Sequence, residues 1–408
     1  MVTEVDKSTV LIVENSLDTT GAFNSIFSYA RYARASYHFV FVLPRESRLV
    51  ERVLSEGFSA ETLPFREINK RPLNLLLYLP TLLVNAVRLN RLVCQHRAAI
   101  VHVNDFYNLA GAAAKLLGGR FALLTHVRFM PDRFPRPLVN GWMKLNLAYS
   151  SHIICVSQAV KDCLTEHPKL RLVYDGLARE DMLKFAATRG LNPSLLQSVA
   201  LPPSMPNTPT PKAVNRKETA SETIRLLYLA HYIPGKGHDI ALEAFGRAYR
   251  QNPTLRLRFI GGDMGLSKNQ QYRTQLIGRA QELGVAPAIT FDGPTAQVGK
   301  ALAQADIALN FSESESFSMT CLEALAQGVP LIVTNCGGPA ELFEHGESGY
   351  LIPNWDVEAG KEAILQLASD IEMRARFSEN SVSHVRRKFS AENTFKKLAD
   401  VYAKALPC

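Results

Sequence analysis

Short apolar runs alternate with stretches of helical periodicity along almost the whole chain of 408 residues. Alternation of this kind is typical of βαβ units and of mostly parallel sheets. Two groups of about six candidate strands indicate an α/β protein with two Rossmann-like domains rather than one large sheet. The candidate strands are 10–13, 39–43, 99–103, 121–124, 152–156 and 170–173 in the first half, and 224–230, 255–260, 288–291, 307–310, 331–334 and 350–352 in the second.

A segment rich in proline, serine and threonine separates the two groups of strands. Five prolines fall between positions 202 and 211, and such a composition cannot pack a core. We therefore expect an N-terminal domain over 1–184, a loop or linker over 185–222, a C-terminal domain over 223–389 and a final helical segment over 390–408.

Most of the net charge of +8 lies in the first half, where residues 1–183 hold 22 Lys and Arg against 16 Asp and Glu. Nucleic acid, an anionic membrane or a phosphorylated substrate would each explain such an excess. No nucleic-acid-binding motif is present, so the last two explanations lead and we expect no nucleic acid partner. Six cysteines without a C-x-x-C pair, and no pattern of a secretory leader or a spanning helix, predict a reducing, cytoplasmic location.

Two carboxylates, Glu315 and Glu323, lie eight residues apart around the start of a predicted helix. Glu315 falls in the loop after an apolar strand, where ligands bind in open α/β sheets. The small polar residues between them would offer backbone amides to an anion, while a carboxylate accepts from two adjacent hydroxyls. The arrangement suits a sugar nucleotide, although Glu323 could instead be a solvated helix residue.

Two glycine-containing turns strengthen the ligand interpretation. Gly337 and Gly338 follow another apolar strand, with Glu341 just beyond, and glycines let the backbone approach a ligand closely. Lys236 stands between two glycines near the start of a predicted helix, which suits a phosphate. Taken alone, Lys236 is better explained as a solvated lysine in a turn, and only the surrounding motifs favour the phosphate.

These segments resemble the retaining glycosyltransferases of family 4, whose E-x7-E motif is usually written E-G-F-G-x-x-x-x-E-A. Ser316 and Ser318 stand where glycine is usual, and His231 stands where the family usually has an arginine before the Lys236-Gly237 pair. The resemblance implies a GT-B fold, in which two Rossmann-like domains with parallel sheets face a central cleft and the last helix crosses back. The matching segments are Glu315-Ser316-Phe317, Glu323-Ala324, Gly328-Val329-Pro330 and Gly337-Gly338-Pro339-Ala340-Glu341.

The resemblance also implies a role for each site residue. Glu315 would hold the hydroxyls of the donor sugar and Glu323 the ribose diol. Lys236, helped by His231, would neutralise the leaving diphosphate together with the loop amides of Phe317, Ser318, Met319 and Thr320.

Three further residues follow from the same resemblance. Gly21 lies in the loop that lets donor phosphates or acceptor approach the N-terminal domain, and Gly262 lies in the turn beside the nucleotide base. His126 ends a strand and would face the cleft as a catalytic residue with Glu315 and Lys236. A strand-end histidine can equally be structural, which is the role we expect for His102.

The predicted function is therefore transfer of a hexose, with retention, from a UDP- or GDP-sugar to a sugar or lipid-linked sugar acceptor, in envelope polysaccharide or glycolipid biosynthesis. We expect no cofactor and no metal, because no carboxylate cluster has metal-ligand spacing. One alternative is a sugar-nucleotide epimerase on the same fold, and another is a non-catalytic GT-B subunit that binds a partner.

Residues 72–87 carry no charge, and basic residues precede and follow them. Pro80 interrupts the stretch, which is short for a membrane span. We expect a buried helix of the N-terminal domain. The alternative is a basic, apolar surface that docks on anionic lipid, which would place the chain peripherally on the cytoplasmic face of the inner membrane.

Overall fold

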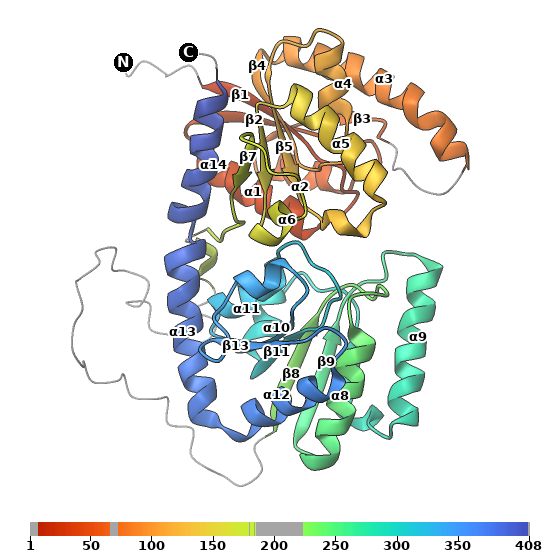
Figure 1. Cartoon of the computed structure of the whole chain (residues 1–408), viewed down its shortest axis with the longest axis vertical. Helices are drawn as coiled ribbons and strands as arrows, with labels where there is room; N and C mark the ends of the chain where they lie inside the picture. Colours follow the sequence, from red (N-terminus) through yellow and green to blue (C-terminus); the bar gives the residue numbers. More distant parts are fainter. Residues whose placement is uncertain (1–6, 66–71, 179, 183, 185–222, 407–408) are drawn as a thin grey trace, which may run out of the picture.

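The computed structural model describes residues 7–65, 72–178, 180–182, 184 and 223–406. The first half forms a seven-stranded sheet with the order β3-β2-β1-β4-β5-β6-β7, drawn in the upper part of Figure 1. The expected linker over 185–222 lies outside the described residues. The strands of this sheet are β1 (Ser8–Val13), β2 (Tyr37–Pro44), β3 (Ser59–Leu63), β4 (Ala98–Val103), β5 (Ala122–Val127), β6 (His152–Cys155) and β7 (Leu170–Leu172).

The second half forms a six-stranded sheet with the order β10-β9-β8-β11-β12-β13. Neighbouring strands pair in parallel throughout both sheets, for example Val10 beside Phe39 and Leu226 beside Leu257. The predicted α/β architecture with two parallel sheets is thus confirmed. The strands are β8 (Ile224–Leu229), β9 (Leu255–Ile260), β10 (Ile289–Asp292), β11 (Ile307–Asn310), β12 (Leu331–Thr334) and β13 (Gly349–Ile352).

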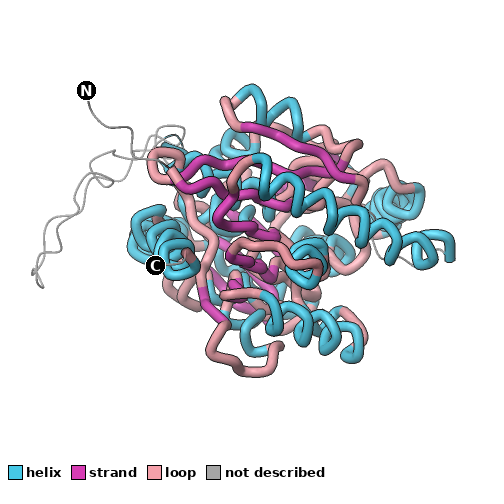
Figure 2. The backbone as a smooth tube through the Cα atoms, turned by 90° about the horizontal axis from the view of Figure 1, so that it is seen from above, coloured by secondary structure: helices cyan, strands magenta, loops and turns pink. Residues whose placement is uncertain are grey.

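Helices cover both faces of the sheets, as the view from above in Figure 2 shows. Parallel strands covered on both faces become continuous apolar runs, which is why they were readily predicted from the sequence. The helices are α1 (Gly21–Ala33), α2 (Leu49–Ser55), α3 (Pro72–Gln95), α4 (Ala110–Leu116), α5 (Arg136–Tyr149), α6 (Gln158–Asp162), α8 (His238–Gln251), α9 (Ser267–Glu282), α10 (Val298–Ala303), α11 (Met319–Ala326), α12 (Val357–Ser369), α13 (Ile371–Phe389) and α14 (Ala391–Ala405).

Strand β3 was missed in the sequence. Its residues Ser59–Leu63 read SAETL, and only Leu63 is buried. The strand pairs with β2 at the edge of the sheet. An edge strand with little burial needs no apolar run, so the hydrophobic pattern contains no signal for it.

The two halves share a hydrophobic cluster and a helix. One continuous cluster contains Val127 and Trp142 from the first half and Leu227 and Leu322 from the second. Helix α13 packs against α11, while α14 packs against α1 beside the first sheet. In Figure 1 these two helices run one above the other along the left edge of the molecule. The ring of Tyr402 in α14 lies 5.3 Å from that of Tyr29, edge to face.

In each sheet the direction of strand addition reverses at one point. The reversal lies between β1 and β4 in the first sheet and between β8 and β11 in the second. Ligands of open α/β sheets bind outside the carboxyl ends of the strands at such a switch point. The loops after β8 and β11 are therefore the place where a site is expected in the second sheet.

The expectation that residues 72–87 form a buried helix is wrong for one face of α3. Ala86 and Leu89 are fully buried, whereas Leu79, Leu83 and Val87 are 70%, 57% and 41% exposed. Both faces of α3 are apolar, so composition alone does not distinguish the buried face from the exposed one. Within the described ranges, no helix combines the length and apolar character needed to cross a bilayer.

Candidate functional site

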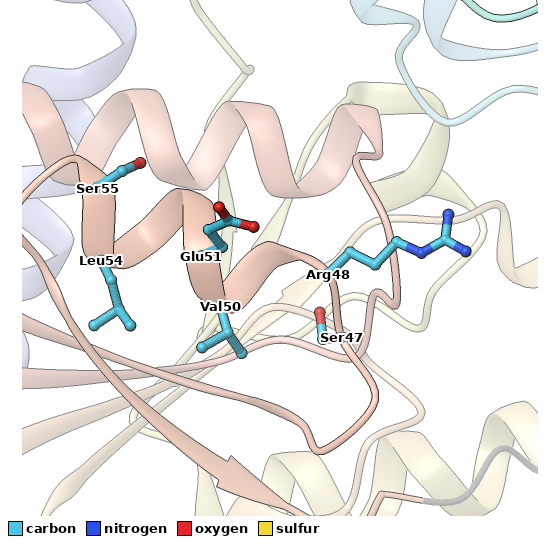
Figure 3. A pocket seen from close by; sticks show the side chains of 6 residues that line it. All are labelled: Ser47, Arg48, Val50, Glu51, Leu54 and Ser55. Carbon is cyan, nitrogen blue, oxygen red and sulfur yellow. The ribbon is translucent and has the colours of Figure 1, made fainter.

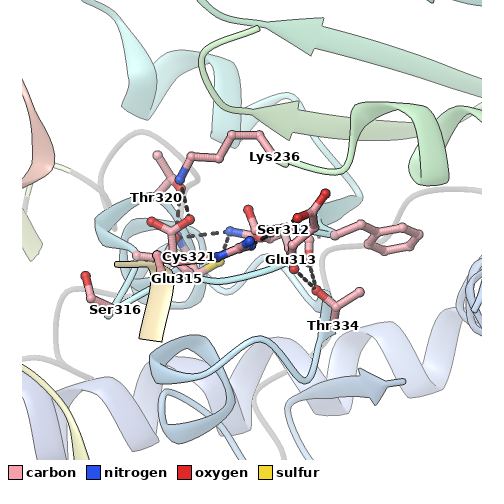
Figure 4. A network of polar contacts seen from close by, with 12 residues as sticks. Lys236, Ser312, Glu313, Glu315, Ser316, Thr320, Cys321 and Thr334 are labelled. Atoms are coloured by element: carbon pink, nitrogen blue, oxygen red, sulfur yellow. Dashed lines mark hydrogen bonds and ion pairs between the residues drawn. The ribbon is translucent and has the colours of Figure 1, made fainter. Parts of the chain in front are cut away.

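The loops after β8 and β11 meet at the switch point of the second sheet, where Lys236 pairs with Glu315. The Lys236 Nζ atom donates to Glu315 Oε2 over 2.5 Å, although the two residues are far apart in sequence. Figure 4 shows this pair between the two loops. Both side chains keep some exposure, 29% for Lys236 and 19% for Glu315, so a ligand can still reach them.

Glycines make this close approach of the two loops feasible. A Cβ atom on Gly237 would stand 1.8 Å from the carbonyl oxygen of Phe311, and φ at Gly237 is +69°. On the other side of the β11 loop, a Cβ on Gly338 would stand 2.0 Å from the carbonyl oxygen of Ser316. Gly337 and Gly338 therefore support the loop that carries Glu315 rather than forming an independent turn.

Lys236 stays charged in this setting. Burial lowers the pKa of Lys236, but the charge and the hydrogen bond of Glu315 outweigh it and raise the pKa above its usual value. The buried Tyr228 hydroxyl ties the two loops together, since it donates to the Lys236 carbonyl and accepts from the Phe311 N–H over 2.7 Å. The site thus presents a fixed cation beside a carboxylate.

The two serines at glycine positions of the family motif have distinct structural consequences. Ser318 has φ +79°, a backbone conformation that favours glycine. Its hydroxyl accepts from the Asn310 amide at 3.2 Å and from the Cys321 N–H at 3.3 Å, which caps α11. The Ser316 hydroxyl donates to the Arg128 carbonyl at 2.8 Å and so links the β11 loop to the first sheet.

Two helix N-termini meet beside this loop. Among the described residues, none accepts from the N–H groups of Met319 and Thr320, the first two of α11. A Cβ on Gly21, which opens α1, would lie 3.5 Å from Met319 Cγ. The structure thus brings Gly21, Met319 and Thr320 together. Helix N-termini carry partial positive charge and free N–H groups, so the region is chemically suited to an anion. Phe317, by contrast, is buried.

Glu323 lies within α11, about one turn from these amides. No described residue forms a hydrogen bond or an ion pair with its carboxylate. Burial, with a smaller effect from the charge of Asp181, raises the pKa of Glu323 to about 7. A half-buried carboxylate without a partner has free acceptor capacity for two hydroxyls.

His231 and Gly262 are neighbours at the carboxyl ends of β8 and β9. His231 is exposed, and its Nδ1 atom lies 3.3 Å from the carbonyl oxygen of Gly262. A carbonyl only accepts, so Nδ1 carries the proton. Neutral His231 then turns a lone pair outward at Nε2, and only the imidazolium could donate from Nε2 to a phosphate.

His126 belongs to a buried polar network of the first sheet. Its Nδ1 atom lies 3.2 Å from Arg128 Nη2 and 3.3 Å from His102 Nε2. His102 Nδ1 in turn lies 2.6 Å from the Tyr402 hydroxyl of α14. Arg128 Nη1 donates to both carboxylate oxygens of Asp175, at 2.5 and 2.7 Å.

The network fixes the proton positions on both histidines. Burial, followed by the charge of Arg128 and then His102, holds the pKa of His126 well below its usual range, so the ring is neutral. Arg128 only donates, so His126 Nδ1 accepts and the proton lies on Nε2. His102 Nε2 then donates to His126 Nδ1, and neutral His102, whose pKa burial lowers to about 3, accepts from the Tyr402 hydroxyl at Nδ1. His126 Nε2 is buried, and no described residue forms a hydrogen bond with it. Within the described residues, His126 contacts His102 and Arg128 and not Lys236 or Glu315.

A clamp between the two halves was not predicted. The Glu341 carboxylate accepts from the N–H groups of Gln158 and Ala159, at 2.9 and 2.7 Å, and from the Tyr174 hydroxyl at 2.8 Å. Glu341 therefore caps α6 of the first half. The G-G-x-x-E motif contained Glu341, but its partners lie in another domain and only the tertiary structure identifies them.

Two other features contribute nothing to this site. A shallow surface hollow of about 720 Å³ lies along α2, as Figure 3 shows. No group of three or more His, Cys, Asp or Glu within the described residues could hold a metal ion. The hollow is lined by Ser47, Arg48, Val50, Glu51, Leu54 and Ser55.

Solved glycosyltransferase structures share the whole architecture. HepE from Anabaena, solved in complex with UDP and glucose, superimposes with a TM-score of 0.74 over 97% of this chain and 99% of its own, at 18% identity. The sucrose-phosphate synthase of Thermosynechococcus elongatus gives a TM-score of 0.74 over 98% and 99%, also at 18% identity. At these identities the similarity establishes the fold, and the predicted GT-B fold is confirmed.

Sequence relatives match part of the chain. A D-inositol 3-phosphate glycosyltransferase of Thermobispora bispora is 31% identical over 204 residues, which are 48% of this chain and 47% of the relative. An N-acetyl-alpha-D-glucosaminyl L-malate synthase of Bacillus anthracis is 33% identical over 122 residues, 30% of this chain and 32% of the relative. The chain thus spans less than half the length of these curated relatives.

Two family models match successive parts of the chain. The model for glycosyltransferase family 4 matches residues 19–180, and the model for glycosyl transferases group 1 matches residues 210–384. The first contains Gly21 and His126, and the second contains Lys236, Glu315 and Glu323. The chain therefore belongs to the group 1 glycosyltransferases, with a family 4 domain ahead of the group 1 domain.

Proposed function

We propose that the chain is a retaining glycosyltransferase that moves a hexose from a UDP- or GDP-sugar to a hydroxyl acceptor. The observation that carries the proposal is the Lys236–Glu315 pair at the switch point, next to the free N–H groups of α11. A cation, helix amides and two carboxylates in one place match a ligand with a diphosphate between two polyol groups.

In this proposal the chain assists departure of the nucleoside diphosphate. Lys236 and the N–H groups of Met319 and Thr320 face the phosphate oxygens as negative charge grows on them, which is the strongest electrostatic contribution available here. Glu315 accepts from hydroxyls of the donor sugar, and Glu323 accepts from the ribose. Because these groups supply the positive charge, we propose that no divalent metal and no cofactor is required.

The finer assignments rest on the relatives. Retention rests on the family resemblance. The Anabaena neighbour was also solved with UDP-glucose, so a uridine donor is the first to test. The named relatives act on D-inositol 3-phosphate and form a malate glycoside, which favours a hydroxyl acceptor. We place the acceptor, a sugar or a lipid-linked sugar, against the N-terminal domain near His126, and the chain in the cytoplasm and at the cytoplasmic face of the inner membrane, in envelope polysaccharide or glycolipid synthesis.

The test is release of nucleoside diphosphate from a panel of UDP-, GDP- and ADP-sugars, with and without a mixture of sugar acceptors and with chelator present. We expect release of diphosphate from one donor class and faster release with acceptor. NMR of the product should show the same anomeric configuration at the transferred sugar as in the donor. Conversion of the donor sugar without an acceptor would identify an epimerase instead. A folded chain that binds no nucleotide sugar would contradict the proposal and favour a non-catalytic subunit.

A further inference from the structure

One side of the N-terminal domain is a layer of three helices with an unusual surface. Helices α3, α4 and α5 lie on the same face of the first sheet, with α3 against α4 and α4 against α5. Their inner sides are buried, for example at Ala86, Ala114 and Trp142. Their outer sides therefore form one continuous side of the molecule, on the upper right in Figure 1.

The outer side of this layer is apolar to an extent unusual for a surface. On α3, Leu79, Leu83 and Val87 follow one another at intervals of four residues, which aligns them along one stripe. Exposed apolar side chains gathered on one side of a molecule mark a site of interaction. The exposed fractions are 70% for Leu79, 57% for Leu83, 43% for Val84, 41% for Val87, 65% for Leu116, 46% for Leu117, 45% for Leu138 and 39% for Leu145.

The charge of the layer has a single sign. Helices α3, α4 and α5 contain no aspartate and no glutamate. They contain five basic residues, of which Arg91, Arg136 and Lys144 are exposed. On the opposite face of the sheet, α2 carries Glu51 and α14 carries Glu392 and Asp400. The layer shares its lack of acidic residues with α1 but not with α2 or α14.

We propose that the α3–α5 layer docks on the surface of an anionic phospholipid bilayer. Leucine and valine side chains insert between acyl chains, while arginine and lysine contact the headgroups, as in interfacial helices. A second copy of the chain fits this surface less well, because two equally basic faces would meet in a symmetric dimer and repel one another.

The docked orientation has a consequence for the site. Helix α5 begins at Arg136, three residues after Arg133, and Arg133 Nη2 donates to the Glu313 carboxylate of the β11 loop over 3.1 Å. The N-terminal end of the layer therefore lies next to the loop that carries Glu315. This step rests on the proposed function and deepens it, since a membrane-docked chain would take its acceptor from the lipid.

Vesicle co-sedimentation tests the docking without any assay of activity. The full chain is mixed with vesicles of phosphatidylcholine alone or with one-third phosphatidylglycerol. We expect binding to the anionic vesicles only. The double variant Leu83→Glu/Val87→Glu should bind at least about tenfold more weakly than the wild type. The single variants Arg91→Gln and Lys144→Gln should each bind about fivefold more weakly. The matched control is Leu54→Glu on α2, because Leu54 is 54% exposed, and it should bind like the wild type.

Each outcome decides the proposal. Equal binding of wild type and the α3 double variant, or no binding to either vesicle type, would overturn it. A dimer in lipid-free solution that the α3 double variant dissociates would also overturn it and assign the surface to a second copy. Donor turnover with a water-soluble acceptor should be the same in wild type and in the double variant, so loss of vesicle binding is distinguished from failure of the proposed function.

Discussion

Replacing Glu323 with glutamine tests the ribose contact, because the change keeps the shape of the side chain and removes its charge. In the proposed complex the ribose hydroxyls donate to the Glu323 carboxylate. Hydrogen bonds to a charged group contribute about 1.5–3 kcal/mol. Donor affinity should therefore fall by about one to two decades in Glu323→Gln at high pH.

The pKa of about 7 in the free chain gives this prediction a second, sharper signature. The ionised carboxylate is the form that binds the diol. Affinity should be close to its maximum at about pH 8, about half of it at pH 7 and about one-tenth at pH 6. Donor binding should also release a proton near neutral pH, because it draws Glu323 into the ionised state.

Calorimetric titration of the donor at several pH values measures both effects. The variant should bind weakly and with no dependence on pH in this range. Stability of the ligand-free chain is the control. The pKa of Glu323 is raised on folding, so its stabilising contribution is present at low pH and is lost as pH rises through about 7. Glu323→Gln should therefore raise the melting temperature at high pH but not at low pH. A wild type whose donor affinity is flat with pH and equal to that of the variant would refute the ribose contact.

Three further predictions concern single residues, and one concerns metal. His231→Arg should preserve or strengthen donor affinity in calorimetry, because it adds a permanent charge, whereas an affinity of His231→Ala equal to that of the wild type would remove His231 from the site. Ser318→Ala keeps the Cβ at φ +79° and loses the hydroxyl bonds to Asn310 and Cys321, so urea unfolding should show a loss of about 1–2 kcal/mol, and Ser318→Gly should lose less. Tyr402→Phe removes the donor to His102 Nδ1, so the nitrogen chemical shifts of His102 and His126 should change in NMR while the fold persists; unchanged shifts would contradict the proton assignment. Excess chelator should leave transfer activity largely intact. Loss of activity with chelator and its recovery with magnesium or manganese would show that Lys236 and the helix amides alone do not neutralise the phosphates.

The sequence predicts the sheets well because the strands are buried on both faces. Runs such as 10–13 and 307–310 are continuously apolar, and their carboxyl ends carry the loops of the site. The edge strand β3 has one buried side chain, so its sequence contains no run of apolar residues from which a strand could be predicted. Helix α3 is apolar on both sides, and composition alone could not tell the buried Leu89 from the exposed Leu83.

Site residues could be predicted where each lies in a recognisable motif in the loop directly after a strand. Lys236 and Glu315 are 79 positions apart, but each follows a strand at the switch point, so the topology brings them together. The contacts between the domains could not be predicted in this way. Glu341 finds its partners on α6, and the Ser316 hydroxyl finds the Arg128 carbonyl, because those distances depend on how two separately folded sheets pack.

The most direct test of the proposed site is a crystal structure of the chain with the nucleoside diphosphate that stabilises it best in a thermal-shift panel. We predict that the phosphate oxygens lie within hydrogen-bonding distance of Lys236 Nζ and of the Met319 and Thr320 N–H groups, with the ribose hydroxyls at Glu323. A diphosphate bound elsewhere on the chain, or one held at this place only through a divalent metal, would contradict it.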